Sequence, residues 1–430
     1  MNYKKINIAI VGFGNIGSYF YKNLISNKKN IITKTGKIPI VKYICAKNLN
    51  KKRNIKIPKK KWIKNPLNLV SKNDVDVIVE LIGGSDGMAK KLVFSALKKG
   101  KHVITANKAL ISKHGNELAY LAEKNNVNLE YEASVAGGVP IIRSIKEGLI
   151  ANKINKVYGI LNGTTNYILT TMETQNKSFD DVLDDAKKRG FTSDNESKLD
   201  IGGYDAAHKI TLLSTIAFGG NVDFNLNQVE GIEKITIEDI NFVKHLGFRI
   251  KLISESFLID NMICSSTKPK LIPLDKPLAN VDGALNAINV ETDQLENLYL
   301  EGEGAGGLAT ASSILSDIFE ISNNSNFRSI GYNINDLKNY QKFDSSNLES
   351  KFYLRLRVKD QPGVLSKITT YLNDSNISVE KILQTPDKKE NNIPILIITH
   401  KIKTSELLNS VNKISDLEFV NENISIIPIE

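Results

Sequence analysis

The chain has 430 residues, 41% of them hydrophobic and 24% charged, which is the composition of a globular protein with room for two or three domains. No run approaches the roughly 18 to 20 apolar residues of a membrane span, and no signal peptide is expected because a strand-like segment begins at Ile6. The formal charge is +10, but no basic stripe is interleaved with aromatic residues, so no nucleic-acid partner is expected. The two cysteines, Cys45 and Cys264, lack metal-ligand spacing and favour a reducing, cytoplasmic location.

The first third of the chain alternates between two kinds of segment. Short apolar runs predict strands at 6–11, 40–45, 76–81, 102–105 and 128–131, and longer amphipathic runs predict helices at 15–27, 88–99 and 109–124. Strands that alternate with helices in this way favour a parallel, doubly wound sheet.

A glycine-rich turn lies between the first strand and the first helix. Its residues are Gly12, Phe13, Gly14, Asn15, Ile16 and Gly17. The glycines permit a tight turn and the close approach of a pyrophosphate, and the helix N-terminus supplies free N–H groups. An ordinary glycine-rich turn is the alternative, but the place after a strand and before a helix favours a dinucleotide site. We therefore expect a Rossmann-type dinucleotide-binding domain over residues 1–133.

The charges of this domain bear on which dinucleotide it binds. Residues 1–73 contain no Asp or Glu, whereas an NAD-binding fold usually carries an acid about 20 residues beyond the glycines. Four basic residues follow the second strand instead: Lys47, Lys51, Lys52 and Arg53. A cationic group there would accept a 2′-phosphate, so we predict NADP rather than NAD as the preferred cofactor. A solvated basic loop is the alternative.

The pattern changes after residue 150. Strands are predicted at 156–160, 230–232, 251–258 and 297–300, and helices at 179–189 and 204–218. They favour a second α/β domain over 134–330, for substrate binding and dimerisation, with its sheet face exposed or used for pairing. The segment 304–330 is expected to close the first domain, and the polar residues 331–350 predict a linker.

The last 80 residues form a separate unit, 351–430. Strands are predicted at 352–358, 377–382 and 393–398, and a helix at 405–417, with a turn at 360–365 that leads into another helix. The order β-α-β-β-α-β is the ferredoxin-like pattern.

Five further segments resemble the homoserine dehydrogenases, in the same order along the chain. They are VITANK at 103–108, YEASVAGGVP at 131–140, GILNGTTNYIL at 159–169, DAAHK at 205–209 and GAGG at 304–307. The C-terminal unit resembles an ACT regulatory domain. The resemblance covers nearly the whole chain and implies the NAD(P)H-dependent interconversion of L-aspartate 4-semialdehyde and L-homoserine in threonine, methionine and isoleucine biosynthesis. It also implies a dimer or tetramer, and a threonine effector facing the turn Asp360–Gly363.

The same resemblance implies roles for individual residues. Lys209 would exchange the proton, and Lys108 would lie beside the nicotinamide and the substrate. Asp205 stands four residues before Lys209 on a predicted helix, so the two share a face, although an ordinary surface ion pair has the same spacing. The other cofactor contacts that the resemblance implies are Thr105, Ala106 and Gly304.

The acidic residues of the family's substrate site correspond to Asp194, Asp200 and Asp205. The chain departs from the family pattern before Asp200. Where the family reads Gly-aromatic-Ala-Glu-Ala-Asp-Pro, this chain reads GFTSDNES at 190–197. Asp194 then stands on the family's glutamate and Glu196 on its aspartate, so either of them is a candidate for holding the substrate.

The resemblance further implies a monovalent cation, Na⁺ in most members, held by Glu132 and by the backbone carbonyl groups of Val135, Gly137 and Val139. All-oxygen ligation suits a hard cation. The alternative is a glycine-rich turn in which Glu132 caps a helix.

Two other functions stay open at the level of the sequence. One is a different two-domain NADP oxidoreductase that acts on an amino acid or a sugar and uses Lys108. The other is an amino-acid-sensing regulator without catalysis, against which the presence of Lys108 and Lys209 and the lack of an output domain argue.

Overall fold

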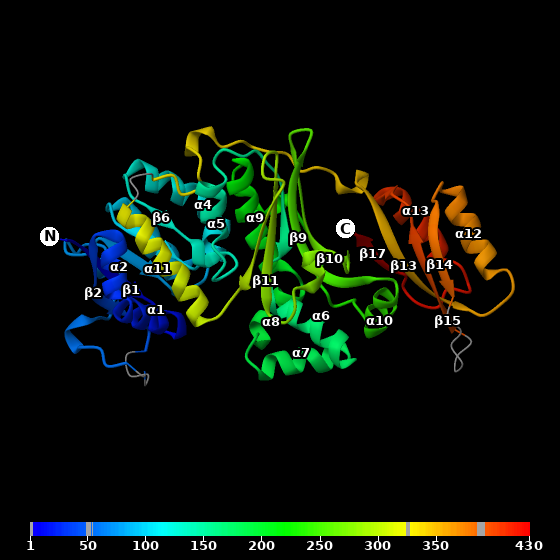
Figure 1. Ribbon diagram of the computed structural model, residues 1–430, viewed down its shortest axis with the longest axis horizontal. Coiled ribbons are helices and arrows are strands. Elements are labelled where there is room, and N and C mark those ends of the chain that lie inside the picture. The colour runs from blue at the N-terminus through cyan, green and yellow to red at the C-terminus, as the bar shows by residue number, and fades with distance from the viewer. Residues whose placement is uncertain (1–2, 49–52, 54, 324–326, 385–391) are drawn as a thin grey trace.

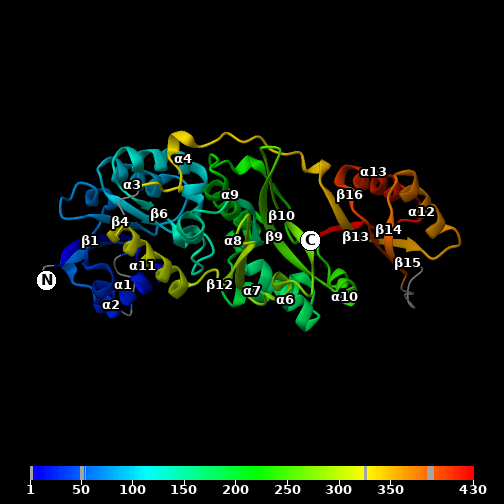
Figure 2. The same ribbon diagram turned by 45° about the horizontal axis from the view of Figure 1, so that its top comes forward.

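The computed structural model describes residues 3–48, 53, 55–323, 327–384 and 392–430. Two members of the predicted basic run, Lys51 and Lys52, lie outside these residues. The chain forms an elongated molecule of three parts in a row, with the N-terminal part at one end and the C-terminal part at the other (Figures 1 and 2).

The N-terminal part is a parallel sheet with helices on both faces (Figure 1). In the residues that the structure describes, the strands follow the order β3-β2-β1-β4-β5-β6. Their bounds are β1 Lys4–Val11, β2 Lys37–Cys45, β3 Trp62–Ile63, β4 Val77–Glu80, β5 His102–Thr105 and β6 Leu129–Glu130, and the helices are α1 Asn15–Ser26, α2 Lys28–Thr35, α3 Gly87–Lys98 and α4 Lys108–Lys124. This order is that of the dinucleotide-binding doubly wound fold, so the predicted fold class is confirmed.

A distant helix completes this part. The helix α11, Gly307–Asn323, lies against α1. Its Ile314 and Ile318 share one buried cluster with Ile8 and Ile10 of β1. The chain therefore leaves the first sheet after β6, builds the central part, and returns through α11 to cover the first sheet.

The central and C-terminal parts share one continuous sheet in the order β12-β11-β7-β9-β10-β17-β13-β15-β14, with β8 beside β10 and β16 beside β13. The strands are β7 Ile154–Ile160, β8 Asn227–Val229, β9 Phe248–Ile259, β10 Met262–Pro273, β11 Leu285–Thr292, β12 Asn297–Glu303, β13 Glu349–Lys359, β14 Val379–Gln384, β15 Asn392–Thr399, β16 Ile402–Lys403 and β17 Ser425–Ile429. The helices are α5 Ile141–Arg143, α6 Gly163–Gln175, α7 Phe179–Lys188, α8 Asp194–Ile201, α9 Tyr204–Phe218, α10 Ile237–His245, α12 Val364–Asp374 and α13 Thr404–Ser415.

One predicted strand is wrong. The residues 230–232 are not a strand, and β8 ends at Val229. The reason is a close approach of Gly231 to the end of α8, where a Cβ on Gly231 would lie 2.2 Å from the carbonyl oxygen of Ile201. The backbone N–H of Ile232 donates to that same oxygen, while that of Glu230 still donates to Thr267 of β10, so the chain leaves the sheet for the end of α8 after Glu230.

The C-terminal part has the predicted β-α-β-β-α-β order and is joined to the centre by its last strand. β17 pairs with β13 and meets β10 where Ile429 lies beside Leu271. The next residue, Glu430, accepts hydrogen bonds from Lys156 at 2.6 Å and from Lys270. The sheet of the C-terminal part is thus an extension of the central sheet.

A buried ion pair between β13 and α10 also joins the C-terminal part to the central part. Arg355 of β13 binds Asp239 of α10, with 2.7 Å between Nε and Oδ1 and 3.2 Å between the second pair of atoms. Tyr353 donates to Asp239 as well. Asp239 has no exposed surface, so the guanidinium of Arg355 is what balances its charge.

The predicted linker, 331–350, lies along the central part instead of crossing solvent (Figure 2). The hydroxyl groups of Tyr332 and Tyr340 donate to the carbonyl oxygens of Ala217 and Phe218, at the end of α9. Farther along, the carbonyl oxygen of Gln341 accepts from the backbone of β10. The linker therefore joins the C-terminal part to the end of α9.

Candidate active site

The glycine-rich turn between β1 and α1 has the geometry of a dinucleotide loop. Gly12 has φ +102°, and a Cβ there would lie 2.3 Å from the carbonyl oxygen of Leu81. A Cβ on Gly17 would lie 2.3 Å from the carbonyl oxygen of Gly12. Gly14 has no heavy atom near its Cβ position, so the space beside the N-terminus of α1 is open to a pyrophosphate.

One basic residue from the predicted run lies at this turn. The Nε atom of Arg53 donates to the carbonyl oxygen of Phe13 at 3.1 Å, and the guanidinium lies 5.1 Å from the ring centroid of Trp62. Lys47 is exposed after the end of β2. Of the basic residues that the structure describes there, Arg53 is therefore the one that touches the glycine-rich turn.

Of the other predicted cofactor contacts, Thr105 and Ala106 lie at the end of β5, and Gly304 follows β12 of the second sheet. Thr105 ends β5, is fully buried, and donates to Glu80 at the end of β4. Ala106 follows it directly. Gly304 lies against Gly137: a Cβ on Gly137 would be 2.4 Å from the carbonyl oxygen of Gly304. These residues surround the carboxyl edge of the sheet, which is where ligands bind in such folds.

Two lysines meet on one carboxylate at this edge. The Nζ atom of Lys108 lies 2.6 Å from Oδ1 of Asp205, and that of Lys209 lies 2.8 Å from Oδ2. Lys108 is the first residue of α4, whose N-terminus Asn107 caps. Asp205 and Lys209 lie on one face of α9. The sequence-predicted pair on α9 is therefore completed by a lysine from the N-terminal part.

The two lysines differ in their surroundings. Lys209 is buried and donates to the carbonyl oxygen of Leu161 at 2.7 Å, and burial lowers its pKa. Lys108 is 40% exposed; burial alone would lower its pKa, but the Asp205 carboxylate raises it above the ordinary value. Burial alone would raise the pKa of Asp205, and the two ammonium groups hold it below its usual range.

The second predicted acid, Asp200, lies on α8 beside the first. Asn162 donates through one amide nitrogen to Asp200 at 2.8 Å and to Asp205 at 2.9 Å. Thr192 donates to the other oxygen of Asp200 at 2.7 Å. Burial and the charge of Asp205 raise the pKa of Asp200.

Asp194 and Glu196, the two candidates for holding the substrate in the loop before Asp200, differ in their surroundings. Asp194 is 88% exposed and pairs with Lys187 at 3.0 Å. Glu196 is exposed too and accepts from Ser193, but its charge acts on Lys108 and helps to raise the pKa of that lysine. Of the two, Glu196 is therefore the one whose charge is seen to act on Lys108.

The predicted cation ligands surround a tight turn before α5. Both carboxylate oxygens of Glu132 accept backbone N–H groups of α5, from Ile142 at 2.9 Å and from Arg143 at 2.8 Å, and burial raises the pKa of Glu132 to about 7. The carbonyl oxygen of Gly137 accepts from Ser313, and that of Val139 from the backbone of α5. In the described chain, no cluster of three His, Cys, Asp or Glu residues has the arrangement of a metal site.

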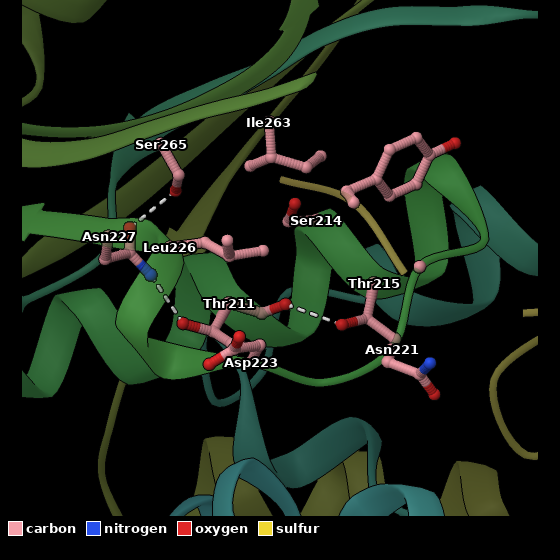
Figure 3. A pocket seen from close by; sticks show the side chains of 11 residues that line it. Thr211, Ser214, Thr215, Asn221, Asp223, Leu226, Asn227, Ile263 and Ser265 are labelled. Atoms are coloured by element: carbon pink, nitrogen blue, oxygen red, sulfur yellow. Dashed lines mark hydrogen bonds between the residues drawn. The ribbon is translucent and has the colours of Figure 1, made fainter. Parts of the chain in front are cut away.

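A small cavity lies at the opposite end of α9 (Figure 3). Its volume is about 10 Å³, and two of the residues that line it, Asn227 and Thr211, are joined by a hydrogen bond that Asn227 donates. Such a space holds about one water molecule. It is therefore no substrate site, and α9 carries its chemistry at the end that bears Asp205 and Lys209.

One residue of the cluster received no role from the sequence. Asn162 belongs to the segment 159–169 that carries the family resemblance, and it contacts both Asp200 and Asp205. Its position before the glycine of a helix start is a capping signal, and its side chain does accept from the backbone of Thr165. A capping signal does not indicate what the amide nitrogen faces.

A doubly wound sheet with a dinucleotide loop, and two lysines on a buried carboxylate at its carboxyl edge, define a nicotinamide-dependent oxidoreductase. Three family models match the chain: "Homoserine dehydrogenase, NAD binding domain" over residues 12–132, "Homoserine dehydrogenase" over 140–319 and "ACT domain" over 352–419. The chain belongs to the homoserine dehydrogenase family, whose members are oxidoreductases that act on a CH–OH group.

Relatives of the same kind span the whole chain. A homoserine dehydrogenase of Neisseria gonorrhoeae is 36% identical over 99% of both chains, and one of Bacillus subtilis is 35% identical over 97% of both. The crystal structure of the Thiobacillus denitrificans enzyme has a TM-score of 0.92 at 35% identity, covering 99% of this chain and 98% of that one. A hyperthermophilic archaeal homoserine dehydrogenase mutant, solved in complex with NADPH, has a TM-score of 0.60 at 26% identity and covers 74% of this chain and 97% of its own.

The relatives and the family models agree with the predicted function, enzyme class and C-terminal ACT domain. The chain binds a nicotinamide dinucleotide through its NAD-binding domain and serves amino-acid biosynthesis. Among the residues that the structure describes, no helix is both long enough and apolar enough to cross a bilayer.

Proposed function

We propose that Lys209 exchanges a proton with the substrate oxygen while homoserine and aspartate 4-semialdehyde are interconverted. The observation that supports this role is the opposite pKa shift of two lysines on one carboxylate. A lowered pKa makes a lysine easier to deprotonate, as a general base must be. In the described part of the chain, two acceptors face the Lys209 ammonium, Asp205 and Leu161, which leaves its third N–H for the substrate.

Lys108 then has a different task. Its raised pKa keeps it charged, so it stabilises negative charge that develops on the substrate oxygen. The nicotinamide ring gives or accepts the hydride. Asp205, which both lysines and Asn162 already bind, positions the two lysines, while Asp200 keeps a partly exposed carboxylate for the substrate ammonium.

The second carboxylate for that ammonium is Glu196 in this proposal. We expect Glu196→Gln to raise the KM for homoserine by about 10- to 100-fold, because a charge-assisted hydrogen bond contributes about 1.5–3 kcal/mol. Asp194→Asn is the matched control and should leave the KM within about twofold, because an exposed ion pair contributes little. Steady-state kinetics at saturating cofactor measure both, and a larger effect of Asp194→Asn would reverse the assignment.

The preferred cofactor in this proposal is NADP. The position of Arg53 at the glycine-rich turn and the NADPH bound by the related archaeal enzyme support it. We expect a lower KM for NADPH than for NADH, and Arg53→Gln should raise the KM for NADPH alone by about 10- to 100-fold. Lys47→Gln removes one charge at an exposed neighbouring position and serves as the control. Equal or better use of NADH by the unsubstituted enzyme would contradict the proposal.

A monovalent cation, with Na⁺ as the expected ion, is proposed at the turn before α5. The carbonyl oxygens of Val135, Gly137 and Val139 suit it, because a carbonyl that accepts one hydrogen bond keeps a second lone pair. Glu132 adds negative charge nearby when it is ionised, but its two oxygens already cap α5. The cation would fix the conformation of this turn beside Gly304.

The ACT domain supports the proposal that an amino acid regulates the enzyme. Threonine is the proposed effector, at the turn Asp360–Gly363, and the cofactor assay repeated with millimolar threonine tests it. Unchanged activity and an unchanged Tm would show that the domain has a structural role only.

The remaining proposals concern assembly and location. The proposed domains are 1–133 closed by 304–330, 134–330 and 351–430, with 331–350 as the linker. The edge strand β14 exposes Ile382 and Leu383, which supports a homo-oligomer, either a dimer or a tetramer. Analytical sedimentation measures the number of subunits. The two unbridged cysteines support a cytoplasmic location.

A further inference from the structure

The loop between β7 and α6 contacts three charged groups of the cluster through two consecutive residues. The carbonyl oxygen of Leu161 accepts from Lys209 at 2.7 Å. The next residue, Asn162, donates to Asp200 and to Asp205. The loop itself is held by Asn286, which donates to the same Leu161 oxygen at 3.0 Å.

The orientation of the Asn162 amide is fixed from the protein side. Its oxygen accepts the backbone N–H of Thr165 at 2.8 Å, as the cap of α6. A backbone N–H can only donate, so it must face the amide oxygen, and the amide nitrogen must face the two carboxylates. A reversed amide would place an oxygen against Asp200 and Asp205 and lose all three hydrogen bonds.

Three carboxylates face two ammonium groups in this cluster, so a neutral side chain at Asn162 adds no further negative charge to it. The charged and titratable side chains that surround it come from three helices: Lys108 of α4, Glu196 and Asp200 of α8, and Asp205, His208 and Lys209 of α9. Two like charges side by side favour protonation of one of them. A donor shared between Asp200 and Asp205 opposes that protonation.

We propose that Asn162 is a positioning residue of the reaction: it bridges Asp200 and Asp205 so that both stay ionised and Asp205 holds Lys209 in place. This inference rests on the proposed role of Lys209. It assigns to Asn162 a function beyond capping α6, and the two functions can be separated because they use different atoms of the amide.

The separating substitution is Asn162→Asp. Aspartate caps a helix as well as asparagine does, so the hydrogen bond from Thr165 is kept while the donor becomes a third carboxylate. That charge raises the pKa of its neighbouring carboxyl groups and of Lys209. We expect the acidic limb of the pH profile of kcat/KM for homoserine oxidation to move up by about one pH unit or more.

Two further variants complete the experiment. Asn65→Asp, at an exposed cap in the N-terminal part, adds the same charge far from the cluster and should leave the profile unchanged. Asn162→Asp/Asp200→Asn restores the number of charges and the shared donor, so its profile should return toward that of the unsubstituted enzyme even if the KM stays high.

The outcomes are distinct. A pH profile of Asn162→Asp that coincides with that of the unsubstituted enzyme, at an unchanged Tm, would overturn the inference and leave Asn162 as a helix cap. A shift that the double variant does not reverse would overturn it as well. The proposed acid–base role of Lys209 fails by a different result, namely a Lys209→Met enzyme that keeps the full rate. The pH profile of Asn162→Asp does not produce that result, so the two failures can be told apart.

Discussion

Lys209→Met is expected to lower kcat for homoserine oxidation by about 10²- to 10⁴-fold, the usual contribution of a general acid–base group. Methionine fills a similar volume but cannot take the hydroxyl proton. The KM for homoserine should change far less, because the substrate ammonium binds to carboxylates in the proposed site.

The pH dependence provides a second test of Lys209. The base must be unprotonated to accept the hydroxyl proton, so oxidation should rise with pH through the pKa of Lys209, and aldehyde reduction should fall through the same pKa. Because burial lowers that pKa, the limb lies below the ordinary lysine value of about 10.4. Lys209→Met should lose the limb in both directions.

A lysine far from the site provides the control. Lys244 on α10 is 55% exposed, and Lys244→Met should keep the full rate and the same pH profile. A Lys209→Met enzyme with more than about a tenth of the original kcat would rule out an essential proton transfer by this residue.

Arg355→Met is expected to cost about 3–5 kcal/mol of the free energy of unfolding, the usual effect of removing one partner of a buried ion pair. The substitution leaves the carboxylate of Asp239 without its counter-charge at a position that has no exposed surface. Urea unfolding at neutral pH measures the loss, and the same variant should loosen the ACT domain from the central part.

A double-mutant cycle distinguishes the ion pair from lost packing. Asp239→Asn removes the charge and keeps much of the cap, so Arg355→Met combined with Asp239→Asn should cost clearly less than the sum of the two single changes. Lys403→Met, at the exposed position of β16, is the matched control and should stay within about 0.5 kcal/mol. Additive single effects would show that the pair contributes no coupling.

The sequence predicted most accurately those elements whose signal is local. The strand His102–Thr105 and the helix Tyr204–Phe218 have the predicted bounds, because an apolar run between breakers fixes each. The pairing of Asp205 with Lys209 follows from helical spacing alone. Arg53 is the last of four basic residues that follow the second strand. The sequence did not indicate which of the four contacts the glycine-rich turn.

Other features depend on contacts between distant residues. The strand β10 was missed because Lys268, Pro269 and Lys270 interrupt its apolar pattern, although the pair Asp260 and Asn261 before it has the positive φ angles of a hairpin turn. The bridge from Asn162 to Asp205 and the ion pair from Asp239 to Arg355 join residues about 40 and over 100 positions apart. No periodicity in a single sequence indicates such partners.

The outer side of β10 has a consequence for how the protein is made. That side is covered in succession by the linker at Ile263, by β8 at 265–267 and by β17 at Leu271. Two of the three covers are translated long after the strand they protect. While the chain emerges from the ribosome, β10 presents an open strand edge of the kind that aggregates. The last stretch of that edge, at Leu271, is therefore covered by β17 only after almost the whole chain has been translated.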